Sequence, residues 1–322
     1  MSALARRFAV AQALAEQAGA LAMRMRPPPG AAQATLKDRQ DWLTEADGAV
    51  ERLLSDGLAA AFPEDGFLGE EAGRTRDGRL RWVVDPIDGT SNYARGAARW
   101  CVSIGLIEGD GFLLGVLAAP AMAEFFAGCQ GQGATLNGVP IQVAATDRLD
   151  RAIIEAGWSP RVSADDYLTL CRRVLDAGVM LRAGGAGALG LADVAAGRMD
   201  GYAELHINLW DCAAALAILT EAGAAVNAFL PGGAAAGGPI LAGAPGVAWA
   251  LAEAAGLPAP PGGRELPQGR HRSCASGQPG PPRRRDAPCG VTPSRAPASK
   301  RIQRPRPAIA GSWRCRRTSR WS

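Results

Sequence analysis

The sequence predicts an α/β (α+β) fold built from two helices, a run of antiparallel strands and a region in which strands and helices alternate. Apolar residues recur every three or four positions over Leu4–Met25 and Val50–Leu58, which is the spacing of two amphipathic helices. Three mainly apolar runs, Trp100–Ile107, Phe112–Ala118 and Glu124–Gly128, then follow one another with short turns between them. This succession predicts an antiparallel sheet backed by the two helices.

The alternating region begins near residue 148. Ile153–Gly157 is typical of a strand, and Asp165–Ala177 and the small-residue stretch Gly184–Gly197 are typical of helices. A strand-like segment, Gly201–Leu209, then leads into an apolar helix that ends at Gly223, and the core is expected to finish near Leu257. We therefore divide the chain into an α+β half over 1–146, an α/β half over 147–257, and a tail over 258–322.

Most of the positive charge is concentrated in that tail. From Arg264 onward there are 15 Lys/Arg and two acidic residues, which leaves 20 of the 35 basic residues against 29 of the 31 acidic ones. The acidic body gives no indication of a nucleic-acid surface. The tail lacks apolar periodicity, which predicts disorder. A basic nucleic-acid-binding arm and a shifted reading frame are alternatives, and the isolated Trp313, Cys315 and Trp321 favour the shifted frame.

The cysteines and the hydropathy of the chain indicate the cellular compartment in which the protein is expected. The seven cysteines are odd in number and form no CxxC pair, which argues against a disulfide framework or a zinc site. No uninterrupted apolar stretch reaches the roughly 18 residues of a membrane span. Arg6-Arg7 precedes an apolar stretch in the manner of a signal peptide, but Gln12, Glu16 and Gln17 interrupt it. We expect a cytoplasmic protein with reduced thiols and no membrane partner.

The segment Leu80–Gly96 carries the residues with the clearest chemistry. Its start, Trp82-Val83-Val84, predicts a buried strand, which ends at Asp85-Pro86-Ile87-Asp88-Gly89-Thr90. Two carboxylates three residues apart across a proline turn can point at one site, and Gly89 lets the backbone approach an anion. Hard oxygen ligands beside an anion-binding turn indicate a Mg²⁺ site that also receives phosphate.

Two further motifs accompany this segment. Gly69-Glu70-Glu71 follows a short strand-like run upstream, and Trp210-Asp211 begins the apolar helix downstream. In isolation, adjacent glutamates are most often a solvated pair, and an aspartate at a helix start is most often an N-cap. The three motifs in this order resemble those of the inositol monophosphatase family of Mg²⁺-dependent sugar-phosphate phosphatases, over roughly residues 1–257. The resemblance implies a layered α/β/α/β/α sandwich, with the active site between the two halves.

The resemblance implies two Mg²⁺ ions. Glu70, Asp85 and the Ile87 carbonyl would hold the first ion. Asp88 and Asp211 would hold the second ion, with Asp85 bridging the two. A third, weaker Mg²⁺ near Glu70 is a further option.

Catalytic roles also follow from the resemblance. Glu70 and Thr90 would orient the attacking water and take up its proton, and Asp47 would orient the Thr90 hydroxyl. Asp47 has a second explanation, because Thr44, three residues earlier, predicts a capping box at the start of a helix. The two roles are compatible.

The resemblance places the substrate against a wider set of residues. Backbone N–H groups near Gly89 would hold the phosphate. Relatives usually carry a hydroxyl residue where this chain has Ala186, so one side-chain hydrogen bond to substrate is not expected here. His206 is more typical of a structural residue than of a ligand. The full set of expected substrate contacts is Ile87, Asp88, Gly89, Thr90, Gly185, Ala186, Gly187, Glu204 and Asp211.

The leading interpretation is a phosphoric monoester hydrolase that acts, with water as nucleophile, on inositol 1-phosphate or a similar polyol phosphate. Histidinol-phosphate phosphatase is the alternative within the family, since a cationic substrate suits an acidic pocket around Glu204. Larger bisphosphates are disfavoured, because only 13 residues separate Glu71 from Asp85. A different class is an RNA- or transcription-associated binding protein on the same fold, with nucleic acid reached through the basic tail. The resemblance also implies a homodimer.

Overall fold

The structure is a computed structural model that describes residues 2–28, 35–38, 41–229 and 237–262. The tail beyond residue 262, with its three alternative interpretations, lies outside the described residues. So do Pro29 and Gly30, the second half of the Pro27-Pro28-Pro29-Gly30 stretch whose sequence predicts the end of the first helix. No described helix combines the length and the hydrophobicity that crossing a membrane requires.

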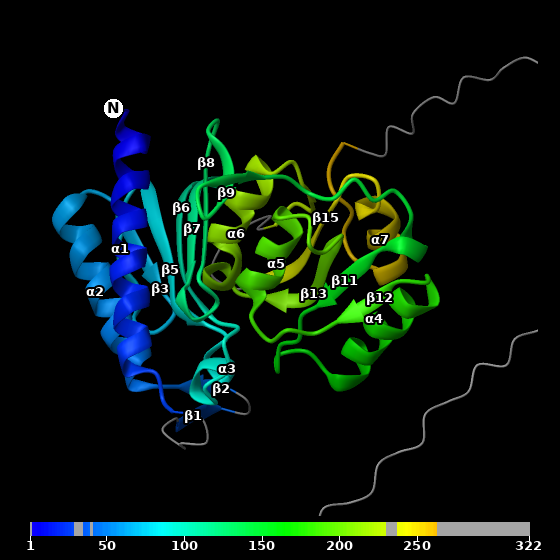
Figure 1. The fold of residues 1–322 in the computed structure, drawn as a ribbon, viewed down its shortest axis with the longest axis horizontal. Coiled ribbons are helices and arrows are strands. Elements are labelled where there is room, and N and C mark those ends of the chain that lie inside the picture. Colours follow the sequence, from blue (N-terminus) through cyan, green and yellow to red (C-terminus); the bar gives the residue numbers. More distant parts are fainter. Residues whose placement is uncertain (1, 29–34, 39–40, 230–236, 263–322) are drawn as a thin grey trace, which may run out of the picture. The chain divides into compact units, whose positions relative to one another are not determined.

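Helices and sheets alternate in five layers, as the α/β/α/β/α prediction requires (Figure 1). Three hydrophobic clusters fill the space between the layers: one under the outer N-terminal helices, one between the two sheets and one under the outer helices of the second sheet. From one side to the other, the helical layers are α1 (Ala3–Met25) with α2 (Glu45–Ala61), α5 (Gly187–Ala195) with α6 (Leu209–Glu221), and α4 (Ala164–Asp176) with α7 (Ala248–Ala255).

The first sheet has eight strands and confirms the predicted run of antiparallel strands, with one parallel pair, β3 and β5. The predicted helices at the N-terminus cover one of its faces as α1 and α2. In spatial order the strands are β10 (Val139–Ile141), β9 (Gly133–Leu136), β8 (Glu124–Cys129), β7 (Gly111–Ala119), β6 (Cys101–Glu108), β5 (Leu80–Asp88), β3 (Gly66–Gly69) and β4 (Gly73–Arg76).

The second sheet has five strands and lies in the alternating region. β11 is parallel to both of its neighbours, β12 and β13, whereas β15 is antiparallel to β13 and β14. Helix α5 connects β12 to β13, and α6 follows β13. In spatial order the strands are β12 (Met180–Arg182), β11 (Ile153–Ala156), β13 (Gly201–Ile207), β15 (Gly238–Gly243) and β14 (Ala225–Val226).

One local expectation was wrong. The stretch Lys37–Asp47 is polar in sequence and typical of a loop ahead of the second helix, but its first part belongs to a two-stranded ribbon of β1 (Thr35–Asp38) and β2 (Asp41–Leu43). Charged residues are depleted in strands, so their abundance here favoured a loop. The backbone pairing of a two-stranded ribbon is compatible with polar side chains, which is why the sequence pattern did not reveal it.

A row of glycines fixes the position of α6 on the first sheet. Gly105, Gly115 and Gly128 are direct cross-strand partners on β6, β7 and β8. A Cβ at Gly115 would lie 1.9 Å from the Ala214 carbonyl oxygen, and one at Gly105 would lie 2.9 Å from the Ala214 backbone nitrogen. The backbone of α6 therefore rests directly on the sheet, which sets where the first turn of that helix points.

Candidate active site

Two of the three acidic site residues come from the end of β5. Residues three apart on a regular strand point to opposite faces, but the pairing of β5 with β6 shifts register between Asp85 and Asp88. This irregularity lets both side chains point to the same side. The Asp85 Oδ1 atom accepts a hydrogen bond from the Ile87 N–H at 2.8 Å, which holds the turn in shape.

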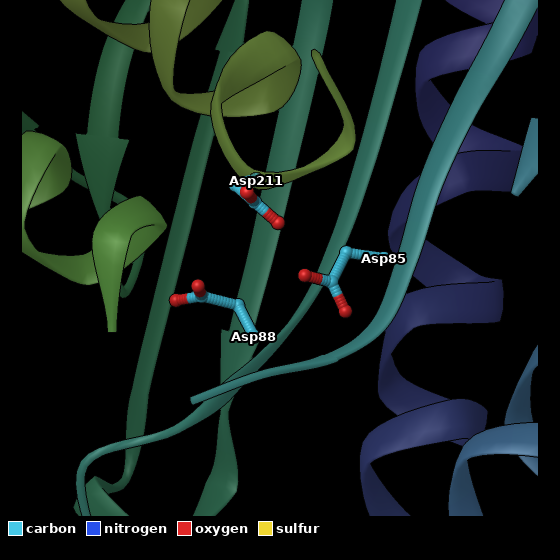
Figure 2. Close-up of side chains that lie close together, drawn as sticks. All are labelled: Asp85, Asp88 and Asp211. Atoms are coloured by element: carbon cyan, nitrogen blue, oxygen red, sulfur yellow. The ribbon is translucent and has the colours of Figure 1, made fainter. Parts of the chain in front are cut away.

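The third acidic residue, Asp211, comes from the first turn of α6. Its Oδ2 atom accepts hydrogen bonds from the backbone N–H of Asn208 at 3.1 Å and from the Asn208 side chain at 3.0 Å. Figure 2 shows the carboxylates of Asp85, Asp88 and Asp211 pointing into one shared space. Each offers a ligand oxygen, and these oxygens lie within 4.8 Å of one another. The N-cap expected of an isolated aspartate and the site role coexist here.

The electrostatics of this cluster fit a divalent cation. Burial, and after it the nearby charge of Asp211, raise the pKa of Asp88 to about 7. Burial also raises the pKa of Asp85, followed by the charges of Glu70 and Asp211. Crowded, buried carboxylates repel one another unless a positive charge lies between them. Hard carboxylate oxygens are the ligands that Mg²⁺ prefers, so the residues present fit this ion.

Glu70 lies directly after β3, close enough to Asp85 for its charge to raise that residue's pKa. Its backbone N–H donates to the Val84 carbonyl at 3.1 Å. The turn that follows is held by Glu51, a buried residue of α2, whose two carboxylate oxygens accept from the N–H groups of Glu71 and Ala72, each at 2.8 Å. Sequence reasoning missed Glu51, because a glutamate inside an amphipathic helix gives no sign of such a contact.

The predicted hydrogen bond between Asp47 and Thr90 is not formed. The Asp47 Oδ2 atom accepts from the N–H and the hydroxyl of Thr44, which is the predicted capping box, and its buried Oδ1 atom has no hydrogen-bond partner among the described residues. The Thr90 hydroxyl instead donates to the Ile87 carbonyl at 2.8 Å. The capping geometry turns one carboxylate oxygen back onto its own helix, and Thr90 finds an acceptor three residues away in its own turn.

Gly89 lies where the turn that carries Asp85 and Asp88 meets the segment that precedes α5. It precedes the short helix α3 (Thr90–Ala94) with a φ of +84°, a conformation that favours glycine. A Cβ there would lie 3.0 Å from the Ala186 Cβ and 3.0 Å from the Arg99 carbonyl oxygen. The same approach leaves Ala186 only 3% exposed, with its methyl group packed close to Gly89.

These elements enclose a cleft of about 570 Å³, in the size range of small-molecule sites. Most of the predicted contacts line it, namely Glu70, Asp88, Gly89, Thr90, Gly185, Ala186, Gly187, Glu204 and Asp211, and so does His206. The lining does not include Ile87, Asp85 or Asp47. Asp85 nevertheless contributes a carboxylate oxygen to the acidic cluster, whereas Asp47 lies in the first turn of α2. Trp158 and Arg161, which the sequence did not single out, also line the cleft.

Glu204 is a buried acid in the wall of this cleft. Burial, the largest cause, and the charges of Asp211, Asp88 and Glu155 together raise its pKa to about 8, against the opposing effect of the hydrogen bond that the Tyr202 hydroxyl donates at 2.6 Å. Space for this pair depends on Gly157, where a Cβ would lie 2.2 Å from both the Glu204 Oε2 and the Tyr202 hydroxyl. Glu204 is therefore largely protonated at neutral pH in the metal-free protein.

This raised pKa predicts how the stability of the metal-free protein changes with pH. The folded protein keeps a proton on Glu204 that the unfolded chain loses above its ordinary value of 4.5, so stability falls as pH rises from about 4.5 to about 8. We expect Glu204→Gln, which mimics the protonated acid, to lose less stability between pH 5 and pH 8.5, by on the order of 3 kcal/mol. Urea unfolding of both proteins in EDTA at the two pH values measures this difference. Identical pH dependence in the two proteins would contradict it.

A layered sandwich with a carboxylate-rich cleft between its sheets is of the sugar-phosphatase type. The chain belongs to the inositol monophosphatase family, whose model matches residues 4–255. It is 39% identical over 197 residues to a protein of Xylella fastidiosa named Nus factor SuhB, covering 60% of this chain and 71% of that protein. It is 40% identical over 195 residues to the inositol-1-monophosphatase of Synechocystis, covering 59% and 67%. The solved inositol monophosphatase of Anabaena superposes with a TM-score of 0.69 at 32% identity, over 80% of this chain and 98% of that one.

Proposed function

We propose that this protein hydrolyses a small phosphate monoester with the help of Mg²⁺, and that inositol 1-phosphate or a similar polyol phosphate is the substrate. The observation that carries the proposal is the convergence of Asp85, Asp88 and Asp211 in a cleft of a family named for this activity. The cytoplasmic location, the homodimer, and the division into halves at residues 146 and 257 remain predictions.

In this proposal the chain's own residues hold and orient the reactants. Glu70, Asp85 and the Ile87 carbonyl would hold one Mg²⁺, and Asp85, Asp88 and Asp211 a second, with a third near Glu70 as an option. Bound Mg²⁺ would offset the negative charge that opposes attack on a phosphate monoester.

Glu70 and Thr90 line the cleft beside the expected position of the phosphate. Since the Thr90 hydroxyl donates its own proton to Ile87, its oxygen is available to accept a hydrogen bond from the attacking water. Glu70 would take up the proton released from that water. Asp47 does not contact Thr90 in the described arrangement, so we assign it a structural role at the start of α2.

Two features support a polyol over a cationic substrate such as histidinol phosphate. A protonated Glu204 can both donate to and accept from a substrate hydroxyl, but it carries no negative charge to attract an ammonium or imidazolium group. Glu155, which also lines the cleft, is already paired with Arg99 at 2.8 Å. The backbone of Gly185–Gly187, which also lines the cleft, would contact the sugar.

The relatives named Nus factor SuhB favour a second candidate function, a role in transcription on the same fold. The two functions are separable by experiment. Phosphate release from inositol 1-phosphate, histidinol phosphate, fructose 1,6-bisphosphate and adenosine 3′,5′-bisphosphate should be measured with Mg²⁺ and with EDTA, alongside RNA binding by the full chain.

We expect Mg²⁺-dependent release that is greatest for inositol 1-phosphate and absent in EDTA. Greatest release from histidinol phosphate would replace the polyol by the cationic substrate. RNA binding without hydrolysis of any of the four compounds would contradict the proposed function in favour of the second candidate.

A further inference from the structure

The segment Ala183–Gly187, which we call the glycine strap, joins β12 to α5 and forms one wall of the cleft. Gly185 within it has a φ of +71°, so the strap bends sharply before α5 begins. A backbone wall of this kind can only orient a substrate if both of its ends are fixed. The C-terminal end is tied to Asp88 of β5, and the N-terminal end is tied to Glu155 of β11 and, through it, to Arg99.

The C-terminal end of the strap is tied to the metal cluster. The N–H of Gly187 donates to Asp88 Oδ1 and the N–H of Ala188 donates to Asp88 Oδ2, each at 3.1 Å. Asp88 is thereby held through both carboxylate oxygens by the first turn of α5. Any displacement of the strap consequently changes the orientation of a carboxylate that is expected to bind Mg²⁺.

The N-terminal end of the strap is tied through a buried ion pair. The Gly184 N–H donates to Glu155 Oε1 at 3.0 Å, and Glu155 Oε2 pairs with Arg99 Nη2 at 2.8 Å. The other terminal nitrogen of Arg99, Nη1, pairs with Asp193 of α5 at 2.9 Å. Arg99 belongs to the connection between α3 and β6, so one side chain links the first sheet to β11 and α5.

A second bond reinforces this end of the strap. The side-chain amide of Asn92, in α3, donates to the backbone carbonyl of Arg99 at 2.8 Å and to that of Gly184 at 3.0 Å. The fit leaves no spare space, because a Cβ at Gly184 would lie 2.3 Å from Arg99 Nε and 2.6 Å from Glu155 Oε1. The place of the strap is therefore set by the place of the Arg99 side chain.

The ion pair is well shielded from solvent. The Glu155 side chain is 3% exposed and the Arg99 side chain 23%. Removing the arginine would leave a buried carboxylate without its counter-ion, which is costly enough for Glu155 to take up a proton or to move toward water. Either response alters the acceptor of the Gly184 N–H and releases the strap.

We infer that Arg99 is a positioning residue, which acts through Glu155 to hold the glycine strap against the substrate and, through the strap, to orient Asp88. Arg99 itself touches neither the substrate nor the metal cluster in this role. The KM measurement that tests this inference rests on the proposed function. The measurement of Mg²⁺ affinity rests on the metal cluster alone.

The test compares Arg99→Met with Arg198→Met in the full-length protein. Arg198 also pairs with Asp193, at 3.2 Å, and with Glu124, and both of these partners lie outside the strap, which makes it a matched control. For Arg99→Met we expect the KM for inositol 1-phosphate to rise about 10-fold with kcat changed less than about threefold. Calorimetric titration with Mg²⁺ should show binding weakened by about threefold or more.

For Arg198→Met we expect both quantities within about twofold of the wild type. An unchanged KM and an unchanged Mg²⁺ affinity in Arg99→Met would overturn the inference, and so would equal changes in the two variants, since these would indicate a general loss of packing. If Arg99→Met does not fold, Arg99→Lys takes its place in the test. A single ammonium keeps only part of the pairing with Glu155 and Asp193, so we expect KM to rise about threefold. A wild-type KM in Arg99→Lys would refute the positioning role.

The two proposals fail in different ways. If the wild type does not hydrolyse inositol 1-phosphate, the proposed function fails, and the Mg²⁺ titration alone tests the positioning role. Mg²⁺ bound more weakly by Arg99→Met than by Arg198→Met would then support the role of Arg99. Equal affinities would overturn it.

Discussion

We expect Asp211→Asn to lower kcat for phosphate-monoester hydrolysis by about 10³-fold or more, because it removes a charged ligand whose contribution to stabilising the transition state is on the order of 4 kcal/mol. The amide keeps the shape of the side chain and one oxygen that can accept from Asn208. The loss therefore reports the missing charge rather than a displaced helix. Steady-state phosphate release at saturating Mg²⁺ measures it.

The same substitution should not unfold the protein. In the metal-free state Asp211 lies among buried carboxylates whose pKa values are raised, so removing one negative charge relieves repulsion with Asp85 and Asp88. We expect a metal-free Tm at or above that of the wild type and a smaller increase on adding Mg²⁺ than the wild type shows, because only the site that includes Asp211 is lost. Asp165→Asn, the same change at an exposed position of α4, is the control and should leave activity and the Mg²⁺ response unchanged. Near-normal kcat in Asp211→Asn would exclude Asp211 from the metal site.

The second large effect is expected for Gly115→Ala. The added methyl group would lie 1.9 Å from the Ala214 carbonyl oxygen, so α6 must move away from the first sheet. We expect the free energy of unfolding to fall by at least about 3 kcal/mol. Because α6 carries Asp211 in its first turn, the variant that still folds should also bind Mg²⁺ more weakly. Urea unfolding and Mg²⁺ titration measure the two consequences.

Gly238→Ala provides the control for this experiment. Gly238 is also a strand glycine, in β15, but a Cβ there would meet no atom within 4 Å. We expect its free energy of unfolding to stay within about 1 kcal/mol of the wild type. Equal stability of the two variants would mean that the glycine row does not determine how closely α6 approaches the sheet.

The parts of this structure that could be predicted from sequence were those with local signals. The apolar run before Asp85 predicted β5, and the spacing of Thr44 and Asp47 predicted the capping box that the structure contains. The successive runs that became β6, β7 and β8 were predicted within a few residues of their bounds. In each case the signal lies within the segment itself.

The parts that could not be predicted depend on partners far apart in the chain. Arg99 and Glu155 are separated by 56 residues, and no periodicity or motif connects them. The ribbon of β1 and β2 includes Lys37, Asp38 and Asp41, charged residues of the kind that usually disfavours strands. The bond expected between Asp47 and Thr90 required a carboxylate orientation that the Thr44 cap does not provide. Short edge strands such as β12 and β14 depend on neighbours that the sequence does not reveal.

The metal centre is the central claim, and anomalous diffraction from crystals grown with Mn²⁺ in place of Mg²⁺ tests it most directly. We expect anomalous density between the carboxylates of Asp85, Asp88 and Asp211, and a further peak beside Glu70 and the Ile87 carbonyl. Loss of the first peak in crystals of Asp211→Asn would tie that density to the carboxylate of α6. Well-ordered crystals with no anomalous density at the three aspartates would contradict the assignment of this cleft as a metal-dependent site.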